Sequence, residues 1–429
     1  MKMEMVGNVM KRKAEAEIGK NKNIKNKKNT VIRCYDFNLA FLILFACAIG
    51  LIIVYSSSAY IAKSKNLESA YFLKRQMMTI GIGVVCMFVF SLVNYKIFRI
   101  RFKFPLPRFI RETIGIDSFV LSVPGIALFF MTILQGYTSF FADINNGAKR
   151  WITVMGVPLQ PSELAKFVVI IFGAYTCAKK SRNKSTILKF FLDIFLVLPL
   201  IFLIAKENLS AALIVAAIYG AIIFTNSKRL SPYIILAGTT YFLVRMFVKL
   251  KGGYRSVRFE IWENVEESEK GQQILQGLYA IASGGIFGKG LGGSEQKYGR
   301  VPEAYNDMIF TIICEEFGIF GGIAIILIFG LILYRMWIVI KNARDRYGAL
   351  LGIGIMAQVG VQVVLNVLVV TNQIPSTGVI LPFISFGGTA IIIMLAEIGV
   401  FLNISLKIRY YDKLSAKNAL KQGDKSVLK

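Results

Sequence analysis

The chain has 429 residues, of which 55% are hydrophobic, and its mean hydropathy is +0.58. This composition excludes an ordinary soluble protein of this length and indicates a polytopic membrane protein. The formal net charge is +26. Most of the cations lie beside apolar runs, where they orient membrane spans and meet anionic lipid, so we do not interpret the charge as a nucleic-acid-binding surface.

The content of histidine and cysteine restricts the possible chemistry. The chain contains no histidine, which excludes an imidazole base and most zinc sites. Its five cysteines lack metal-ligand spacing and mostly fall inside apolar runs, so we interpret them as small buried hydrophobic residues. The sequence therefore predicts no metal site and requires no cofactor, and acid–base chemistry depends on carboxylates, Lys, Tyr or Cys.

In chain order, residues 1–34 come first and are rich in Lys and Asn, which predicts a basic, disordered tail. Residues 35–408 are predicted to form an all-α membrane domain, because about 20 apolar residues cross the hydrocarbon core as a helix. About ten transmembrane helices are expected, at 37–58, 78–94, 118–137, 162–178, 187–205, 209–226, 231–248, 307–333, 349–371 and 387–406. Residues 409–429 form a second tail.

Basic residues predict the orientation of these spans. Both tails and every second loop between the spans carry clusters of Lys and Arg. The positive-inside rule makes that side cytoplasmic, so both termini are expected in the cytoplasm. The other side receives a large external loop, 249–306, between spans seven and eight. The external loop near 59–77 departs from the rule because it carries four cations, Lys63, Lys65, Lys74 and Arg75.

The first polar segment that stands out lies around the start of span four. It contains Lys149, Arg150 and Trp151, followed by Glu163 and Lys166. Glu163 and Lys166 are three residues apart and can pair on one helix face. An interfacial Trp anchor, a helix cap and a local ion pair would explain this segment as well as a binding site does.

The second segment, residues 282–293, is rich in glycine. It lacks the spacing of a P-loop and the strand that should precede one. We interpret it as flexible backbone that approaches a ligand closely.

The third segment leads into span eight and contains Arg300, Glu303 and Asp307, with Glu315 and Glu316 further into the span. A carboxylate where a span begins is costly unless it is paired or kept partly desolvated for proton chemistry. Asp307 is therefore either a helix N-cap, a catalytic base, or both.

The fourth segment, 375–389, combines two prolines, three glycines and Ser385. It predicts either a broken, re-entrant backbone, which is buried in protein or lines a wet cavity, or a tight interhelical turn. In span nine, Gln358, Gln362 and Asn366 predict one polar stripe that avoids lipid. Glu397 in the last span needs a partner that the sequence does not name.

Together these segments resemble the SEDS family of cell-wall proteins, which comprises FtsW, RodA and SpoVE. The family patterns NGAxRWI…QPSELAK, GGxxGxGLG…PEAxxDxIF…EExG and PxTGxxLPFxSxGG match residues 146–166, 284–318 and 375–388 in order. The stretch 301–305 is more similar to the FtsW/SpoVE branch. One departure is Asn208, which stands where the family often has Asp.

The resemblance implies an inverting peptidoglycan glycosyltransferase that polymerises lipid II and releases undecaprenyl diphosphate, in cell division or sporulation. Asp307 matches the family's catalytic position. A lipid diphosphate leaves readily, so one carboxylate base with nearby cations would suffice, whereas glycosidases use two carboxyls. Candidates for substrate binding are Lys149, Arg150 and Arg300 for the diphosphate, Trp151 for a sugar, Glu303 for the acceptor, and Glu163, Lys166 and Ser385.

The resemblance also implies the partners, which are lipid II, the growing glycan strand, membrane lipids and a class B penicillin-binding protein. It places the chain in the bacterial cytoplasmic membrane and leaves open a divalent cation at the diphosphate. Two alternative functions remain, a lipid II flippase and a scaffold that only recruits the penicillin-binding protein. The crowding of polar residues toward one face favours the polymerase over the flippase.

Overall fold

The computed structural model describes residues 35–105, 118–141, 151–154, 157–179, 187–226, 262, 265 and 271–406. All of them belong to one folding unit, Tyr35–Leu406. The predicted tails, the predicted span 231–248, Lys149 and Arg150 lie outside the described residues.

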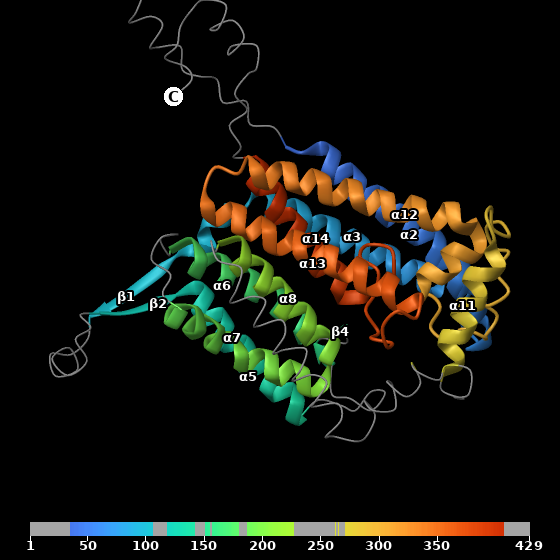
Figure 1. Ribbon diagram of the computed structural model, residues 1–429, viewed down its shortest axis with the longest axis horizontal. Coiled ribbons are helices and arrows are strands. Elements are labelled where there is room, and N and C mark those ends of the chain that lie inside the picture. Colours follow the sequence, from blue (N-terminus) through green and yellow to red (C-terminus); the bar gives the residue numbers. More distant parts are fainter. Residues whose placement is uncertain are drawn as a thin grey trace, which may run out of the picture. The chain divides into compact units, whose positions relative to one another are not determined.

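The described chain is mostly helical (Figure 1). Its helices are α2 (Phe37–Ser64), α3 (Tyr71–Leu92), α5 (Val123–Phe141), α6 (Pro161–Lys179), α7 (Ile187–Glu207), α8 (Leu209–Asn226), α11 (Gln272–Gly284), α12 (Ile309–Lys341), α13 (Arg346–Val370) and α14 (Gly388–Ser405), with a short 3-10 helix, η1 (Tyr95–Arg99).

Six helices within the described ranges are long and apolar enough to cross a membrane, namely α2, α3, α6, α12, α13 and α14. Shorter apolar stretches lie in α5 and α8. These helices make the chain a multi-pass membrane protein, as the composition predicts, while the count of ten spans stays a prediction. Helix α11 was not predicted, and it lies within the segment 249–306 that we expected to be a loop.

Two short hairpins correct the all-α prediction. Strand β1 (Arg101–Pro105) pairs antiparallel with β2 (Ser118–Ser122), and β3 (Ile152–Val154) pairs with β4 (Val157–Leu159). The third span was therefore predicted to begin five residues too early, because 118–122 is a strand and α5 begins at Val123. Hydropathy does not separate the two cases, since Phe, Val and Leu are apolar in a strand as in a helix.

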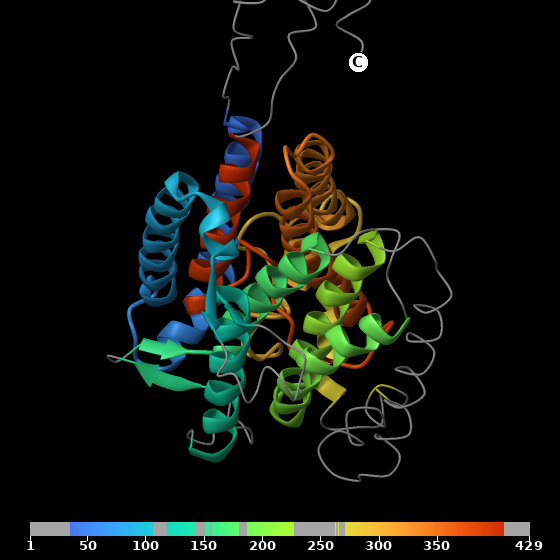
Figure 2. The ribbon, with the colours of Figure 1, turned by 90° about the vertical axis from the view of Figure 1, so that its left-hand side faces the viewer.

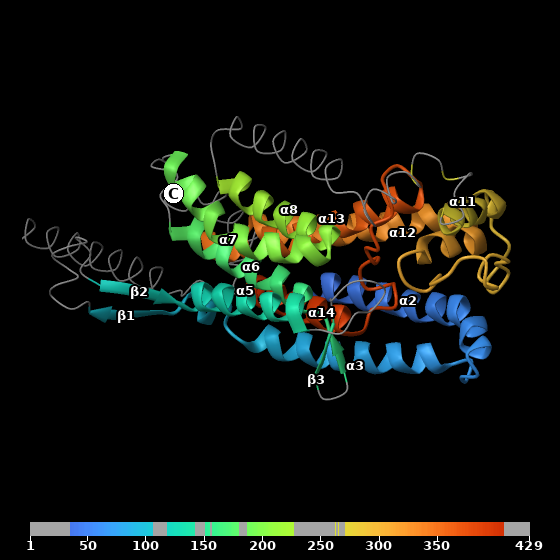
Figure 3. The same cartoon turned by 90° about the horizontal axis from the view of Figure 1, so that it is seen from below.

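Helix α14 occupies the middle of the described bundle. It packs along α3 and also contacts α13, and Figures 2 and 3 show it between these two helices. The approach to α3 depends on Gly399, where a Cβ would lie 2.3 Å from the main-chain oxygen of Met87. Small residues commonly allow such close packing between membrane helices. Helix α13 in turn packs against α6, α8 and α12, and α12 packs against α2.

Contacts between distant segments identify the two ends of this bundle. At one end lies Asp36, which precedes α2. Its carboxylate accepts a hydrogen bond from Arg335 of α12 at 2.8 Å, and its main-chain N–H donates one to the hydroxyl of Ser405 of α14 at 3.3 Å. The start of α2 and the end of α14 therefore lie together. The other end carries the segments 299–308 and 375–388, which precede α12 and α14.

Candidate active site

Asp307 is half-buried in the turn that leads into α12. Met308, and not Asp307, occupies the N-cap position of that helix, so the N-cap alternative was wrong. The Oδ2 atom of Asp307 lies 4.0 Å from the position that a Cβ on Gly378 would take. Gly378 has a φ of +68°, a conformation that favours glycine. The carboxylate therefore lies against a glycine of the segment 375–388.

Asn366 holds this arrangement together from α13. Its fully buried amide donates hydrogen bonds to the main-chain oxygens of Asp307 and Val379, both at 2.8 Å. The predicted polar stripe is confirmed as buried, because Gln358 and Gln362 are at most 2% exposed as well. One side chain of the stripe thus fixes the backbone of the candidate base relative to the segment that faces it.

Tyr305 makes a second connection between the same two segments. Its main-chain oxygen accepts a hydrogen bond from Phe386 N at 2.9 Å. Its ring lies 4.6 Å from that of Phe72 in α3 and 5.6 Å from that of Phe386. Burial raises the pKa of Tyr305, and the charge of Glu303 adds to this. The hydrogen bond and ring contacts of Tyr305 therefore anchor the turn before Asp307.

The segment 375–387 is irregular backbone, which is buried at residues 379 and 381–385 and exposed at Gly378. Whether it re-enters the membrane stays a prediction. Ser385 is fully buried, and its hydroxyl accepts a hydrogen bond from Leu381 N at 2.8 Å. Gln76 of α3 donates to the main-chain oxygen of Ser385 at 3.1 Å, and Ser210 of α8 donates to that of Thr377 at 2.9 Å. These bonds satisfy peptide groups that no helix pairs. In this structure Ser385 holds the turn, and a role in substrate binding stays a prediction.

The predicted pair Glu163–Lys166 exists on α6, with Nζ and Oε2 2.7 Å apart and both residues buried. The structure also supplies the partner that the sequence did not name for Glu397. Its buried carboxyl interacts electrostatically with Lys166 and Glu163, beside Gln358 of α13. Glu163 and Glu397 thus share Lys166. This group lies beside Gln358, at the other end of the polar stripe from Asn366.

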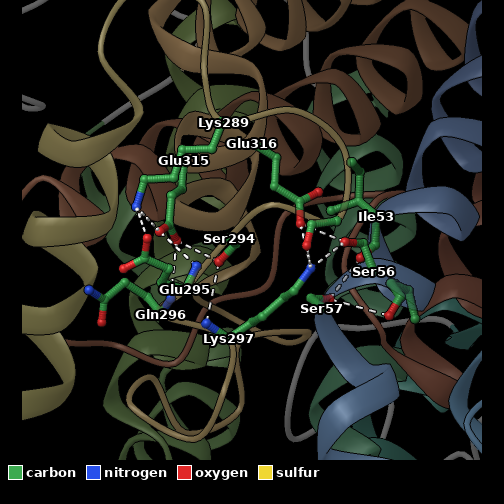
Figure 4. A network of polar contacts seen from close by, with 12 residues as sticks. Ile53, Ser56, Ser57, Lys289, Ser294, Glu295, Gln296, Lys297, Glu315 and Glu316 are labelled. Atoms are coloured by element: carbon green, nitrogen blue, oxygen red, sulfur yellow. Dashed lines mark hydrogen bonds and ion pairs between the residues drawn. The ribbon is translucent and has the colours of Figure 1, made fainter.

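Two buried acids of α12 form a network that sequence reasoning missed (Figure 4). Glu315 accepts hydrogen bonds from Lys289 Nζ at 3.1 Å and from Ser294. Glu316 accepts them from Lys297 Nζ at 2.9 Å and from Ser56 of α2 at 2.6 Å.

The acids of this network favour the charged form of Lys289. Partial desolvation opposes its charge, but hydrogen bonds and the negative charges of Glu315 and Glu295 outweigh it and raise the pKa of Lys289. A signal for the pairing was present in the sequence, because two adjacent acids in a span require cations and two lysines precede them closely.

A break in α12 explains why the glycine-rich segment packs here. Gly318 has a φ of +68° and interrupts the helix. The carbonyl oxygens of Glu315 and Glu316 accept hydrogen bonds from Lys289 N at 3.0 Å and Gly290 N at 2.9 Å. Ile319 N donates to the oxygen of Gly285 at 3.0 Å. The described residues thus show this backbone packed closely against the broken helix, and a close approach to a ligand stays a prediction.

The remaining predicted site residues are more exposed. Trp151, Arg300 and Glu303 all reach the surface, and Glu303 Oε2 accepts a hydrogen bond from Asn306 Nδ2 at 3.0 Å. Arg300 and Glu303 share with Asp307 the segment that precedes α12, whereas Lys149 and Arg150 lie outside the described residues. Within the described part of the chain, no group of three or more His, Cys, Asp or Glu residues could hold a metal ion. A divalent cation at the diphosphate stays a prediction.

Comparison with known proteins gives relatives along nearly the whole chain. The stage V sporulation protein E of Bacillus subtilis (strain 168) is 34% identical over 381 residues, which cover 87% of this chain and 98% of the relative. The probable peptidoglycan glycosyltransferase FtsW of the same organism is 32% identical over 403 residues, covering 91% and 95%. Both belong to the branch that residues 301–305 resemble.

Solved structures share the fold. A chain from a peptidoglycan synthase complex, described as coordinating polymerization and crosslinking, aligns with a TM-score of 0.69 at 23% identity, covering 88% of this chain and 99% of that chain. The rod shape determining protein RodA of Thermus thermophilus aligns with a TM-score of 0.60 at 22% identity and the same coverage. A family profile described as "Cell cycle protein" matches residues 37–410. This chain therefore belongs to the FtsW/RodA/SpoVE family.

Proposed function

We propose that this chain is a peptidoglycan glycosyltransferase, which polymerises lipid II into glycan strands and releases undecaprenyl diphosphate. Relatives more than 30% identical over almost the whole chain carry the name "Probable peptidoglycan glycosyltransferase FtsW". The observation that carries the proposal is the placement of Asp307, a half-buried carboxylate whose backbone is bonded to Asn366 and whose side chain faces Gly378. A carboxylate that is partly desolvated and held in place suits a general base.

In the proposed reaction, Asp307 takes the proton from the acceptor sugar hydroxyl. The hydroxyl oxygen forms a bond to the anomeric carbon of the donor, while the bond from that carbon to the lipid diphosphate breaks. The diphosphate leaves with the bonding electrons, and Asp307 later returns its proton to water. Attack opposite to the leaving group inverts the anomeric configuration.

Other residues would bind the substrates around this base. We assign Lys149, Arg150 and Arg300 to the diphosphate, because a guanidinium or ammonium group neutralises developing phosphate charge. The exposure of Arg300 on the segment that carries Asp307 supports its assignment. A divalent cation would add to that neutralisation.

The same proposal assigns further side chains to the sugars and the cavity. Glu303 would orient the acceptor, and Trp151 would stack on a sugar. Glu163 and Lys166 would shape the cavity wall, with Ser385 completing it. The exposure of Trp151 and Glu303 supports their assignments.

The proposed topology has ten spans in residues 35–408, both tails (1–34 and 409–429) in the cytoplasm, and the segment 249–306 outside the bacterial plasma membrane. The contact of Asp36 with Arg335 and Ser405 supports it, because it brings the start of α2 and the end of α14 to one end of the bundle. Asp307 belongs to the opposite end, where an extracytoplasmic reaction would take place.

We further propose a class B penicillin-binding protein as partner. The solved relative with the TM-score of 0.69 comes from a complex described as coordinating polymerization and crosslinking. Crosslinking by a partner would complement a chain that only extends glycan strands. Lipid II would reach both activities from the surrounding membrane.

The decisive experiment compares wild-type protein with Asp307→Asn in detergent, with purified lipid II as substrate and product length as readout. Loss of a general base should slow polymerisation by about 10²–10⁴-fold. Glu68→Gln serves as a control, since Glu68 is an exposed acid paired with Lys74. Normal polymerisation by a folded Asp307→Asn variant would exclude the proposed base.

Two outcomes would support the alternatives instead. In liposomes, transfer of labelled lipid II across the bilayer without chain growth would indicate a flippase. Full function of Asp307→Asn in cells would indicate a scaffold. Both measurements use the same pair of proteins.

A further inference from the structure

A groove with a volume of about 600 Å³ lies between α2, α3 and the segment 291–298. Asp307 is not among its lining residues, so it is distinct from the candidate active site. Its volume is within the range of small-molecule and lipid sites, which is roughly 300–1,000 Å³. Both helices are candidate membrane spans, so the groove lies beside acyl chains.

The groove is mostly apolar, with Ser56 and Lys297 midway along it and further polar residues at one end. Leu51 and Met77 line it far from the loop that joins α2 and α3, whereas Lys63 and Ser69 line it next to that loop. Positions 51 and 63 are separated by about 18 Å along the helix, at 1.5 Å per residue. An amphipathic molecule would therefore bind with its head at the loop and its tail toward the middle of the bundle.

The charges around the groove favour an anionic head. Its charged lining residues are Lys63 and Lys297. Lys297 is already neutralised, because its ammonium group binds Glu316 at 2.9 Å and also Ser56 and the oxygen of Gly292. Lys63 is exposed, and Glu68, the acid of the same loop, pairs with Lys74 at 2.7 Å. The mouth of the groove thus carries one positive charge that the loop acid does not offset.

We propose that this groove binds a membrane phospholipid with an anionic phosphodiester head group. An acyl chain would occupy the apolar part, and the phosphate would lie at Lys63, with the hydroxyls of Ser69 and Tyr60 as donors. A single ammonium group matches the single charge of a phosphodiester better than the higher charge of a lipid diphosphate. The proposal also explains why this loop is basic although it lies on the side that we predict to be external.

Occupancy would order the segment that leads to the candidate base. Leu291 and Tyr298 form one wall of the groove, and the ring of Tyr298 packs edge-on against Tyr60 at 5.2 Å. Tyr298 precedes Asp307 by only nine residues. The site is independent of the proposed reaction, and it can be tested by binding alone.

The test measures lipid retention by the full chain in detergent, using native mass spectrometry. The probes are phosphatidylglycerol and phosphatidylcholine with identical acyl chains. Lys63→Gln removes the charge from the mouth. Lys65→Gln is the matched control, because Lys65 is an exposed lysine of the same loop that does not line the groove. Met77→Trp fills the apolar part at a half-exposed position, so that folding is preserved.

We expect Lys63→Gln to weaken phosphatidylglycerol binding about fivefold, since one lysine near a membrane surface contributes about that factor. Phosphatidylcholine binding should fall less, because its choline cation offsets the phosphate charge that Lys63 attracts. Lys65→Gln should behave as wild type, and Met77→Trp should weaken both lipids. If Lys63→Gln and Lys65→Gln weaken phosphatidylglycerol binding equally, the effect comes from general surface charge, and the proposed site is wrong. Equal binding of both lipids, or displacement only by a polyprenyl diphosphate, would also overturn it.

Discussion

Asn366 and Asp307 are joined through the main chain, because the amide of Asn366 donates to the carbonyl oxygen of Asp307 at 2.8 Å. The same amide donates to Val379 O at 2.8 Å. One buried side chain of α13 therefore sets the distance between the candidate base and the backbone opposite it. An error of about 1 Å in such a position can cost a hundredfold in rate.

We predict that Asn366→Ala lowers polymerisation of lipid II at least tenfold per folded molecule. The change leaves two buried carbonyl groups without this donor, at a cost of about 1–3 kcal/mol each, and releases the backbone of Asp307. Asn403→Ala is the matched control, since Asn403 is also a buried amide, bonded to Ser91 O at 2.6 Å near the other end of the bundle. It should reduce stability but not the rate. Equal rate losses in the two variants would contradict a positioning role for Asn366.

The pair Lys297–Glu316 should show strong coupling in a double-mutant cycle. Lys297→Met leaves the fully buried Glu316 without its cation, and we expect this to destabilise the protein by about 3–5 kcal/mol. Lys297→Met combined with Glu316→Leu removes both charges and should recover most of the loss. Thermal unfolding in detergent measures both. If the double variant is as unstable as the single one, then Ser56 and the main chain, and not the charge pair, hold the segment.

Gly318→Ala should disrupt the break in α12. A Cβ at this position would lie 2.2 Å from the oxygen of Ile286, and the φ of +68° disfavours any side chain. Gly330 lies in the same helix with nothing within 4 Å of an added Cβ, so Gly330→Ala should be neutral or stabilise by up to about 1 kcal/mol. Limited proteolysis of the segment 285–298 gives the readout. Unchanged protection in Gly318→Ala would contradict the importance of the break.

Glu163 and Glu397 should respond differently to replacement by leucine. Glu163 binds Lys166 at 2.7 Å, so Glu163→Leu should destabilise by about 3–5 kcal/mol. Glu397→Leu removes the second acid, which repels Glu163, and leaves that ion pair intact, so the change should be neutral or stabilising. Its melting temperature should equal or exceed that of wild type. A large decrease in Glu397→Leu would make Glu397 an equal partner of Lys166.

The sequence was sufficient for features that depend on neighbouring residues. Long apolar runs predicted α2, α12, α13 and α14, because the hydrophobicity of a membrane span is a property of its own sequence and does not depend on its neighbours. Gln358, Gln362 and Asn366 follow one another at intervals of four residues, which predicted a shared helix face. The three-residue spacing of Glu163 and Lys166 predicted their ion pair. The three motifs at 146–166, 284–318 and 375–388, in the order found in the family, predicted membership in the FtsW/RodA/SpoVE family, and the family profile confirms it.

Features that depend on tertiary packing could not be predicted in the same way. Lys289 pairs with Glu315, and Lys297 pairs with Glu316. Both pairs depend on the packing of the glycine-rich segment against α12 at the break at Gly318. The partner of Glu397 lies on a helix more than two hundred residues away in the chain. Residues 118–122 form a strand only because 101–105 lie beside them.

The break at Gly318 has a mechanical consequence. It separates residues 309–317 from the rest of α12 as a short helix. Lys289 and Lys297 form ion pairs with Glu315 and Glu316 near the C-terminal end of this short helix. Asp307 lies just before its N-terminal end. A displacement of the glycine-rich segment would therefore move this short helix and, with it, the turn that carries Asp307.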